Sequence, residues 1–213
     1  MFLVTIGAFL LPLVFTITGP VPQEENEKSI AVTNAVTEAA GPSPDSHVIV
    51  GKDYSLKQAY KDVFVILAAH NTCSDFFGGP AIATSVLNQF IGKIQQDSLP
   101  DSVSFQMSGR PGEFLDLTTG ASYRLFNKVM VNSEGSFYQR RFDPMRQRPR
   151  NVGRFPPGTR SARALILMHE LGHLIRGRNG RWLIPDDGND SWQSKQNTAQ
   201  VESVCHEQLK TLN

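Results

Sequence analysis

Between residues 56 and 95, apolar residues recur at the spacing of an α-helix. A helix is predicted over residues 56–69, with Ser55 as its cap, and a second over residues 81–95, where an apolar residue stands close to every fourth position. The turn-forming segment 71–79 separates them. We therefore expect the two helices to pack as a hairpin.

The pattern changes to alternation beyond residue 100, as is typical of strands. Apolar Val103, Phe105 and Met107 alternate with polar residues, and residues 114–118 are also compatible with a strand. Residues 123–131 and 136–140 flank a turn at residues 132–135 and predict a β-hairpin. A small mixed or largely antiparallel sheet is expected.

Two more helices are predicted after the sheet. An irregular Arg/Pro-rich connection, residues 143–158, leads to a helix over residues 162–176, which Thr159 or Ser161 can cap. The last helix covers residues 196–210. The order of the predicted elements, with helices before and after the strands, indicates an α+β domain over residues 47–213. A short C-terminal helical subdomain is expected within it.

The N-terminal part of the chain has a different composition. Residues 1–18 are apolar and uncharged, which predicts a signal peptide or a retained N-terminal anchor, although no Lys or Arg precedes the apolar run. Residues 19–46 are rich in Pro, Glu, Ser, Thr and Ala and predict a disordered tether or a pro-segment. Either assignment of residues 1–18 places the domain outside the cytoplasm, secreted or periplasmic, with membrane contact only through an uncleaved anchor.

The two cysteines, Cys73 and Cys205, lie far apart in the sequence. In an oxidising compartment they are expected to form a disulfide between the first helical region and the last helix. Without export, two buried free thiols are the alternative.

Eight arginines crowd the stretch between residues 140 and 163. No aromatic interleaving and no nucleic-acid motif accompanies them, so a solvated loop is favoured over steering of acidic partners, and no specific nucleic-acid partner is predicted. A basic arm that binds an anionic polymer is a further alternative. The charge pattern carries no information on oligomeric state.

The sequence H-E-L-G-H, from His169 to His173, carries the clearest chemical signal. Four residues advance an α-helix by about 400°, so the two imidazoles lie about 40° apart on one face and can share one Zn²⁺. Glu170 points where it can serve as the general base for a zinc-activated water. The opposite side of the helix is apolar, so we expect the histidine face to border a cleft.

This motif looks like the active-site helix of the zincin metallopeptidases, and the order of helices, sheet and motif resembles their upper subdomain. The resemblance covers one short motif and the layout. It implies peptide hydrolysis by zinc-activated water, with the substrate strand antiparallel to a sheet edge. The metzincin branch is disfavoured because Arg176 and Asn179 stand where its pattern has Gly and a third His.

Two carboxylates are candidates for the third zinc ligand. Glu202, on the last predicted helix, would suit the gluzincin pattern, whereas Asp187 lies in an Asp-Gly loop and would suit zincins with an Asp ligand. Residues 165–210 also look similar to short exported bacterial proteins of uncharacterised function, which favours Asp187. Asn197 is expected to be a buried hydrogen-bonding residue that holds the last helix.

The function predicted from these residues is that of an exported zinc metallopeptidase acting on peptide, protein or cell-wall amide bonds. The alternative is a non-catalytic exported interaction module with a structural or vestigial metal site. Only 40 residues follow His173. So short a segment would form only a thin lower wall for a substrate cleft, which favours the non-catalytic module.

Overall fold

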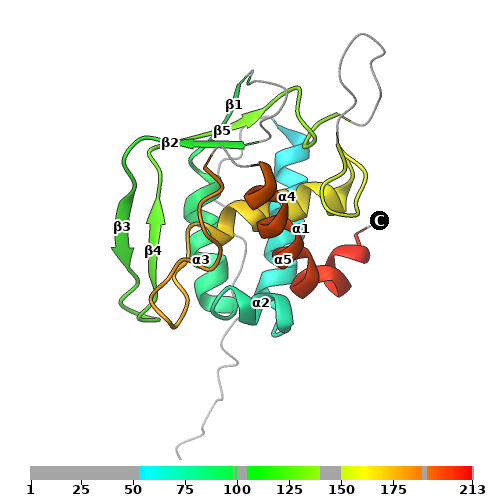
Figure 1. Ribbon diagram of the computed structural model, residues 1–213. Coiled ribbons are helices and arrows are strands. Elements are labelled where there is room, and N and C mark those ends of the chain that lie inside the picture. Colours follow the sequence, from blue (N-terminus) through cyan, green and yellow to red (C-terminus); the bar gives the residue numbers. More distant parts are fainter. Residues whose placement is uncertain (1–52, 98, 100–104, 140–149, 189–190, 213) are drawn as a thin grey trace, which may run out of the picture. The chain divides into compact units, whose positions relative to one another are not determined.

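The computed structural model describes residues 53–97, 99, 105–139, 150–188 and 191–212 (Figure 1). The predicted signal or anchor and the predicted tether lie outside these residues. Within them, none of the helices has the length and apolar character that crossing a membrane requires. The described residues form an α+β arrangement of five helices and a small amount of sheet.

The N-terminal helices form a pair, as expected, with an additional short helix between them. Helix α1 (Tyr54–Ala68) is capped by Asp53 rather than Ser55, since the Asp53 carboxylate accepts the amide of Leu56 at 3.0 Å. Helix α3 (Pro80–Ile91) packs against it. The segment predicted to be a turn contains α2 (Thr72–Phe76), which Asn71 and Ser74 stabilise with a capping box.

The end of the second predicted helix is a strand, so that boundary was wrong. Helix α3 ends at Ile91 before Gly92, and β1 (Ile94–Asp97) follows. Strand β1 runs parallel to β5 (Lys128–Asn132), with Ile94 opposite Val129. Pairing with a distant strand therefore overrides a helical pattern that would have continued to residue 95.

The described strands form two separate sheets, a mixed sheet of three strands and an antiparallel sheet of two. Strand β5 lies between β1 and β2 (Phe105–Ser108), parallel to the first and antiparallel to the second. A separate antiparallel pair consists of β3 (Gly112–Leu115) and β4 (Ser122–Leu125). The single strand predicted over residues 123–131 is thus two strands in different sheets.

The predicted hairpin after residue 131 does not form either. Residues 136–138 are turns, and the amides of Tyr138 and Gln139 both donate to the carbonyl of Gly135 at 3.1 Å. The Phe137 side chain is completely buried. Burial of this ring in the core, rather than cross-strand pairing, accounts for the path of the chain here.

Helix α4 (Arg160–Gly172) is the central element, with α1 and α5 (Ser191–Lys210) packed against it (Figure 1). Of its two predicted caps, Thr159 is used, accepting the amide of Ala162 at 3.2 Å. Helix α5 begins five residues before its predicted start. The apolar side of α4 is completely buried, at Leu165, Leu167, Met168 and Leu171.

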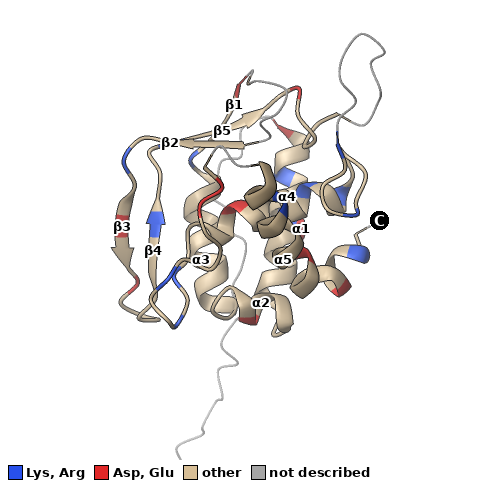
Figure 2. Ribbon diagram, viewed as in Figure 1, with Lys and Arg blue, Asp and Glu red and all other residues tan. Residues whose placement is uncertain are grey.

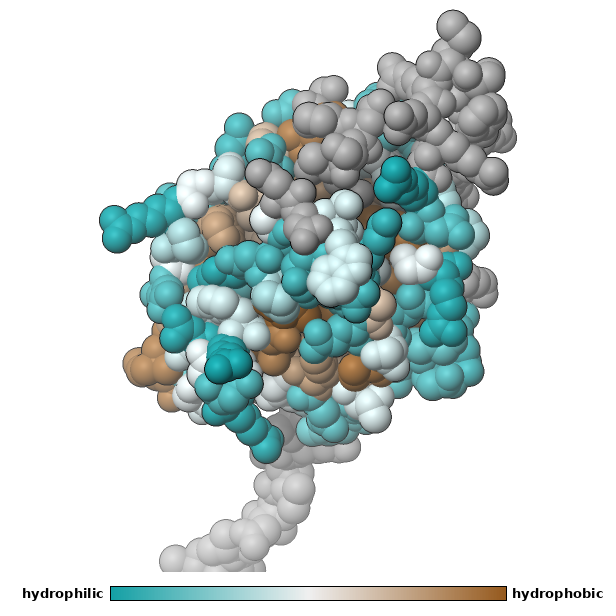
Figure 3. Space-filling view, in the orientation of Figure 1, coloured by the Kyte–Doolittle hydropathy of each residue, from teal (hydrophilic) through white to brown (hydrophobic). Residues whose placement is uncertain are grey.

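Figure 2 marks the positions of the charged residues along the ribbon. Several arginines of the basic stretch make intramolecular contacts. Arg163 is buried and donates to the carbonyl of Phe137 at 2.8 Å. Arg160 pairs with Asp62 and Arg154 with Glu202, at 2.6 and 2.7 Å. In the described part of the stretch these side chains therefore help to hold the fold. The view in Figure 3 shows hydrophilic side chains over most of one face, with small apolar areas between them.

The expected disulfide is present between Cys73 and Cys205 and joins α2 to α5 across 132 residues. Cys73 also touches the sulfur of Met168 on α4, at 3.8 Å. Replacing both cysteines by Ala should lower the free energy of unfolding by about 2–5 kcal/mol, because the unfolded chain loses a long-range constraint. Urea denaturation of the two proteins checks this. Equal midpoints would contradict it.

Candidate metal centre

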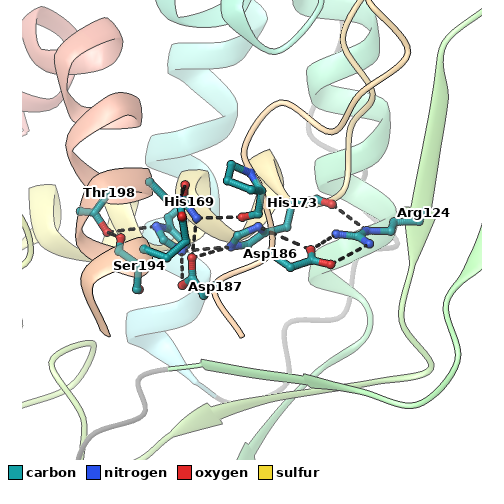
Figure 4. A network of polar contacts seen from close by, with 10 residues as sticks. Arg124, His169, His173, Asp186, Asp187, Ser194 and Thr198 are labelled. Atoms are coloured by element: carbon teal, nitrogen blue, oxygen red, sulfur yellow. Dashed lines mark hydrogen bonds and ion pairs between the residues drawn. The ribbon is translucent and has the colours of Figure 1, made fainter. Parts of the chain in front are cut away.

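The two histidines of the H-E-L-G-H segment meet at their ring nitrogens (Figure 4). His173 lies just beyond the last residue of α4 but keeps a helical backbone, with φ −71° and ψ −18°. It therefore remains one turn from His169, and their Nε2 atoms are 3.1 Å apart. Both residues are buried, with exposed fractions of 5% for His169 and 3% for His173.

Asp187 comes to these nitrogens from the loop before α5. Its Oδ2 lies 3.0 Å from Nε2 of His169 and its Oδ1 3.5 Å from Nε2 of His173. The loop can approach because Gly172 has no side chain: a Cβ there would lie 2.9 Å from Ile184. One ligand atom from each of the three residues lies within 4.8 Å of the other two.

Helix α5 supplies the surroundings of this cluster. Thr198 Oγ1 donates to the carbonyl of Ser194 at 2.9 Å and lies 3.0 Å from Nδ1 of His169. Its proton is thus engaged, so it accepts from Nδ1–H, and Nε2 of a neutral His169 is then left to bind a cation. Asn197 donates to Asp187 Oδ1 at 2.5 Å and to the carbonyl of Pro185 at 2.8 Å.

Asn197 is buried and hydrogen-bonded, as predicted, and it ties α5 to the Asp187 loop. Thr198 was not singled out by the sequence. Its position one turn after Ser194 on a helix is an ordinary spacing. Only the packing of α5 against α4 shows that its hydroxyl meets a histidine.

The electrostatics of the three residues reflect their mutual contact. Burial alone would lower the pKa of His169, but the hydrogen bond with Asp187 and the charge of Glu170 outweigh it and raise that pKa. Burial, and then the charge of His169, lower the pKa of His173 to about 4. Burial would raise the pKa of Asp187, yet its hydrogen bond with His169 and nearby charges bring it to about 2. His173 is therefore neutral and Asp187 ionised at neutral pH.

The donor set fits a divalent cation. Lone pairs of His169, His173 and Asp187 converge, and such a group needs either a shared proton or a cation between its members. Ligands about 2.0–2.1 Å from a tetrahedral ion lie roughly 3.3 Å apart, close to the 3.0–3.5 Å found here. Two imidazoles and one carboxylate are a ligand set suited to Zn²⁺ with one position left for water.

Glu170 lies beside this cluster, on the same helix. Glu170 is half-buried, so part of the residue remains accessible to solvent. This burial raises the pKa of Glu170 to about 7, the charge of His169 lowering it and that of Asp187 raising it. A carboxyl group that titrates near neutral pH is suited to accept and return a proton.

Glu202, the alternative third ligand, has a different role. It is buried, and its carboxylate accepts from the side chain and the backbone amide of Arg154, at 2.7 and 3.3 Å. The close fit extends to Gly153, where a Cβ would lie 2.0 Å from Glu202 Oε2. Glu202 thus anchors the segment before α4 to α5, and it is absent from the cluster of converging ligand atoms.

Substituting Thr198 by Val should weaken zinc binding about 10–100-fold, because His169 loses the acceptor that orients its ring and fixes its tautomer. The isosteric change removes only the hydroxyl. Competition with a chromophoric chelator measures the affinity, and Thr198→Ser, which keeps the hydroxyl, is the matched control. A Val variant that binds zinc like the Ser variant would refute this role.

The centre is assembled from the end of α4, the loop before α5 and the first half of α5. Its geometry and charges carry the functional argument. No protein-family model, curated protein or solved structure matches this chain.

Proposed function

We propose that this chain is an exported zinc metallopeptidase with a zincin-like fold, which hydrolyses peptide or cell-wall amide bonds. The observation that carries the proposal is the convergence of two buried imidazole nitrogens and a carboxylate beside Glu170. The disulfide between α2 and α5 supports export, because such bonds persist in oxidising compartments.

In this proposal His169 and His173 hold the ion through Nε2, and Asp187 through a carboxylate oxygen. When bound, zinc acts as a Lewis acid and brings the pKa of a water molecule to about 7. The positive charge of the ion also favours the ionised form of Glu170. The base is therefore ready to accept a proton at neutral pH.

Glu170 carries the proton transfers. It takes a proton from the water as the water oxygen attacks the peptide carbonyl carbon. It then returns that proton to the amide nitrogen as the carbon–nitrogen bond breaks, so the amine and the carboxylic acid leave with no net change in the enzyme. One residue can serve both steps because it carries the proton from the first step to the second.

A structural metal site in a non-catalytic module is the second candidate. The burial of both histidines favours it, because structural zinc sites are closed whereas catalytic sites keep an open position. Partial exposure of Glu170 favours the enzyme, as does the convergence of three protein ligands, rather than four, among the residues that the structure describes.

The test is hydrolysis of a peptide library of mixed sequence by the purified full-length protein, read by mass spectrometry. The proposal expects zinc-dependent cleavage that a chelator abolishes and added Zn²⁺ restores. The same assay on isolated cell-wall peptides distinguishes the two substrate classes. Stoichiometric zinc without turnover on either would support the structural candidate.

A further inference from the structure

Arg124, on β4, is a buried cation close to the metal centre (Figure 4). Only 7% of the residue is exposed. Its Nε donates to the backbone carbonyl of His173 at 2.8 Å, and its two terminal nitrogens face the carboxylate of Asp186, one of them at 3.4 Å. The Arg124 guanidinium therefore contacts the candidate ligand His173 on one side. On the other side it contacts Asp186, which directly precedes the candidate ligand Asp187.

These contacts connect segments that are distant in sequence. The carbonyl of His173 lies at the C-terminal end of α4, where helix carbonyls lack intrahelical donors, so a cation is favourable there. Asp186 directly precedes Asp187 in the loop. The planar Arg fork satisfies both acceptors at once and so sets the distance between the end of α4 and the loop.

The position of the Arg124 guanidinium is itself held by aromatic rings. It lies over Trp182, 4.2 Å from the ring centroid, and 5.4 Å from that of Phe126. Arg176 also stacks on Trp182, at 4.5 Å, and pairs with Glu113 on β3 at 3.0 Å. The fork is thus restrained before any metal enters.

His173 provides a second, independent observation. Its Nδ1 is buried and lacks a hydrogen-bond partner among the described residues, and a carboxylate oxygen of Asp186 lies 4.0 Å from it. An imidazole that binds metal through Nε2 carries its proton on Nδ1 and needs an acceptor there. The Asp186 side chain is 65% exposed, which leaves room for one oxygen to move about 1 Å to hydrogen-bonding distance while the other stays with Arg124.

We propose that Arg124 and Asp186 are positioning residues of the metal centre: Arg124 ties the end of α4 to the Asp187 loop, and Asp186 accepts the Nδ1 proton of His173. This inference rests on the proposed zinc site and concerns how that site is kept in shape. Neither residue touches the substrate or the ion in this role. Their removal acts through His173 and Asp187.

The test is the zinc dissociation constant of full-length Arg124→Lys and Asp186→Ala, the second of which removes the acceptor, measured by competition with a chromophoric chelator. Each should weaken zinc binding about 10–100-fold, the usual effect of losing an outer partner of a ligand. The Lys variant keeps the charge but cannot bond both acceptors. Because Arg124 and Asp186 are also each other's partners, the effects of the two variants should not add, and the double variant should lose less zinc affinity than the product of the two single losses.

Arg154→Lys is the matched control, since Arg154 also binds a carboxylate, but that of Glu202 instead of Asp186. Its zinc affinity should equal that of the wild type. The absorption spectrum of the Co²⁺-substituted protein supplies a second readout, because a reoriented His173 alters the d–d bands. The exposed Asp186 keeps the test valid even if Arg124→Lys fails to fold.

The outcomes separate this inference from the proposed function. A wild-type chain that binds no zinc would overturn both. A wild type that binds zinc, with Asp186→Ala binding equally well and giving the same cobalt spectrum, would overturn the positioning roles alone. Peptide cleavage is not needed for either decision.

Discussion

Replacing Glu170 by Gln is expected to abolish peptide hydrolysis while the protein keeps its zinc. Gln has the same shape but cannot take a proton from water, and loss of a general base costs about 10²–10⁴-fold in rate. The loss should fall on kcat, with KM nearly unchanged, because Glu170 does not hold the substrate in this proposal. Steady-state kinetics on one identified peptide, with metal analysis of the same samples, measures both.

The free energy of unfolding of the Glu170→Gln variant, measured against pH, is the control that shows whether the variant folds. The pKa of Glu170 rises from 4.5 to about 7 in the folded protein, so folding of the metal-free chain loses stability as pH rises through this interval. Gln does not titrate, so the variant keeps its stability over this interval. Above about pH 7 the metal-free Glu170→Gln variant should therefore be more stable than the metal-free wild type. If Glu170→Gln hydrolysed the peptide as fast as the wild type, Glu170 could not be the general base.

Replacing Asp187 by Ala should cause the largest loss of zinc affinity among the carboxylate variants. It removes a ligand, and it leaves the lone pairs of His169 and His173 without the charge that completes the centre. The decrease should exceed the roughly 10–100-fold typical of outer-shell changes. Zinc content after dialysis and the dissociation constant by chelator competition measure it.

Glu202→Gln is the matched comparison, because it tests the other candidate ligand. Zinc affinity should stay at the wild-type value, while stability falls by about 1–3 kcal/mol as the buried carboxylate that binds Arg154 loses its charge. If instead the Glu202 variant loses zinc and the Asp187 variant retains it, the assignment of the third ligand is reversed.

The parts of the fold that could be predicted are those held by local interactions. Helices α1, α4 and α5 were expected from apolar spacing, and Thr159 was among the caps proposed for α4. The sequence pattern failed at residues 94–95 and 126–127. There, pairing of β1 with β5 and the division of one apolar run between two sheets depend on partners far along the chain.

The candidate site divides in the same way. The placement of His169 and His173 on one helical face follows from a period of about 3.6 residues, which no distant contact is needed to create. The choice between Asp187 and Glu202 depended on which carboxylate the packed chain brings to the histidines. Sequence spacing alone left both open.

By itself, then, the sequence determined that two imidazoles and an acid lie on one helix, since helix geometry relates residues one turn apart. Only the tertiary structure decided that Asp187 joins them, that Glu202 binds Arg154, and that Thr198 and Arg124 surround the centre. These contacts join segments 18 to 49 residues apart. Their geometry depends on how helices, loop and sheet pack, which a local pattern of residues does not encode.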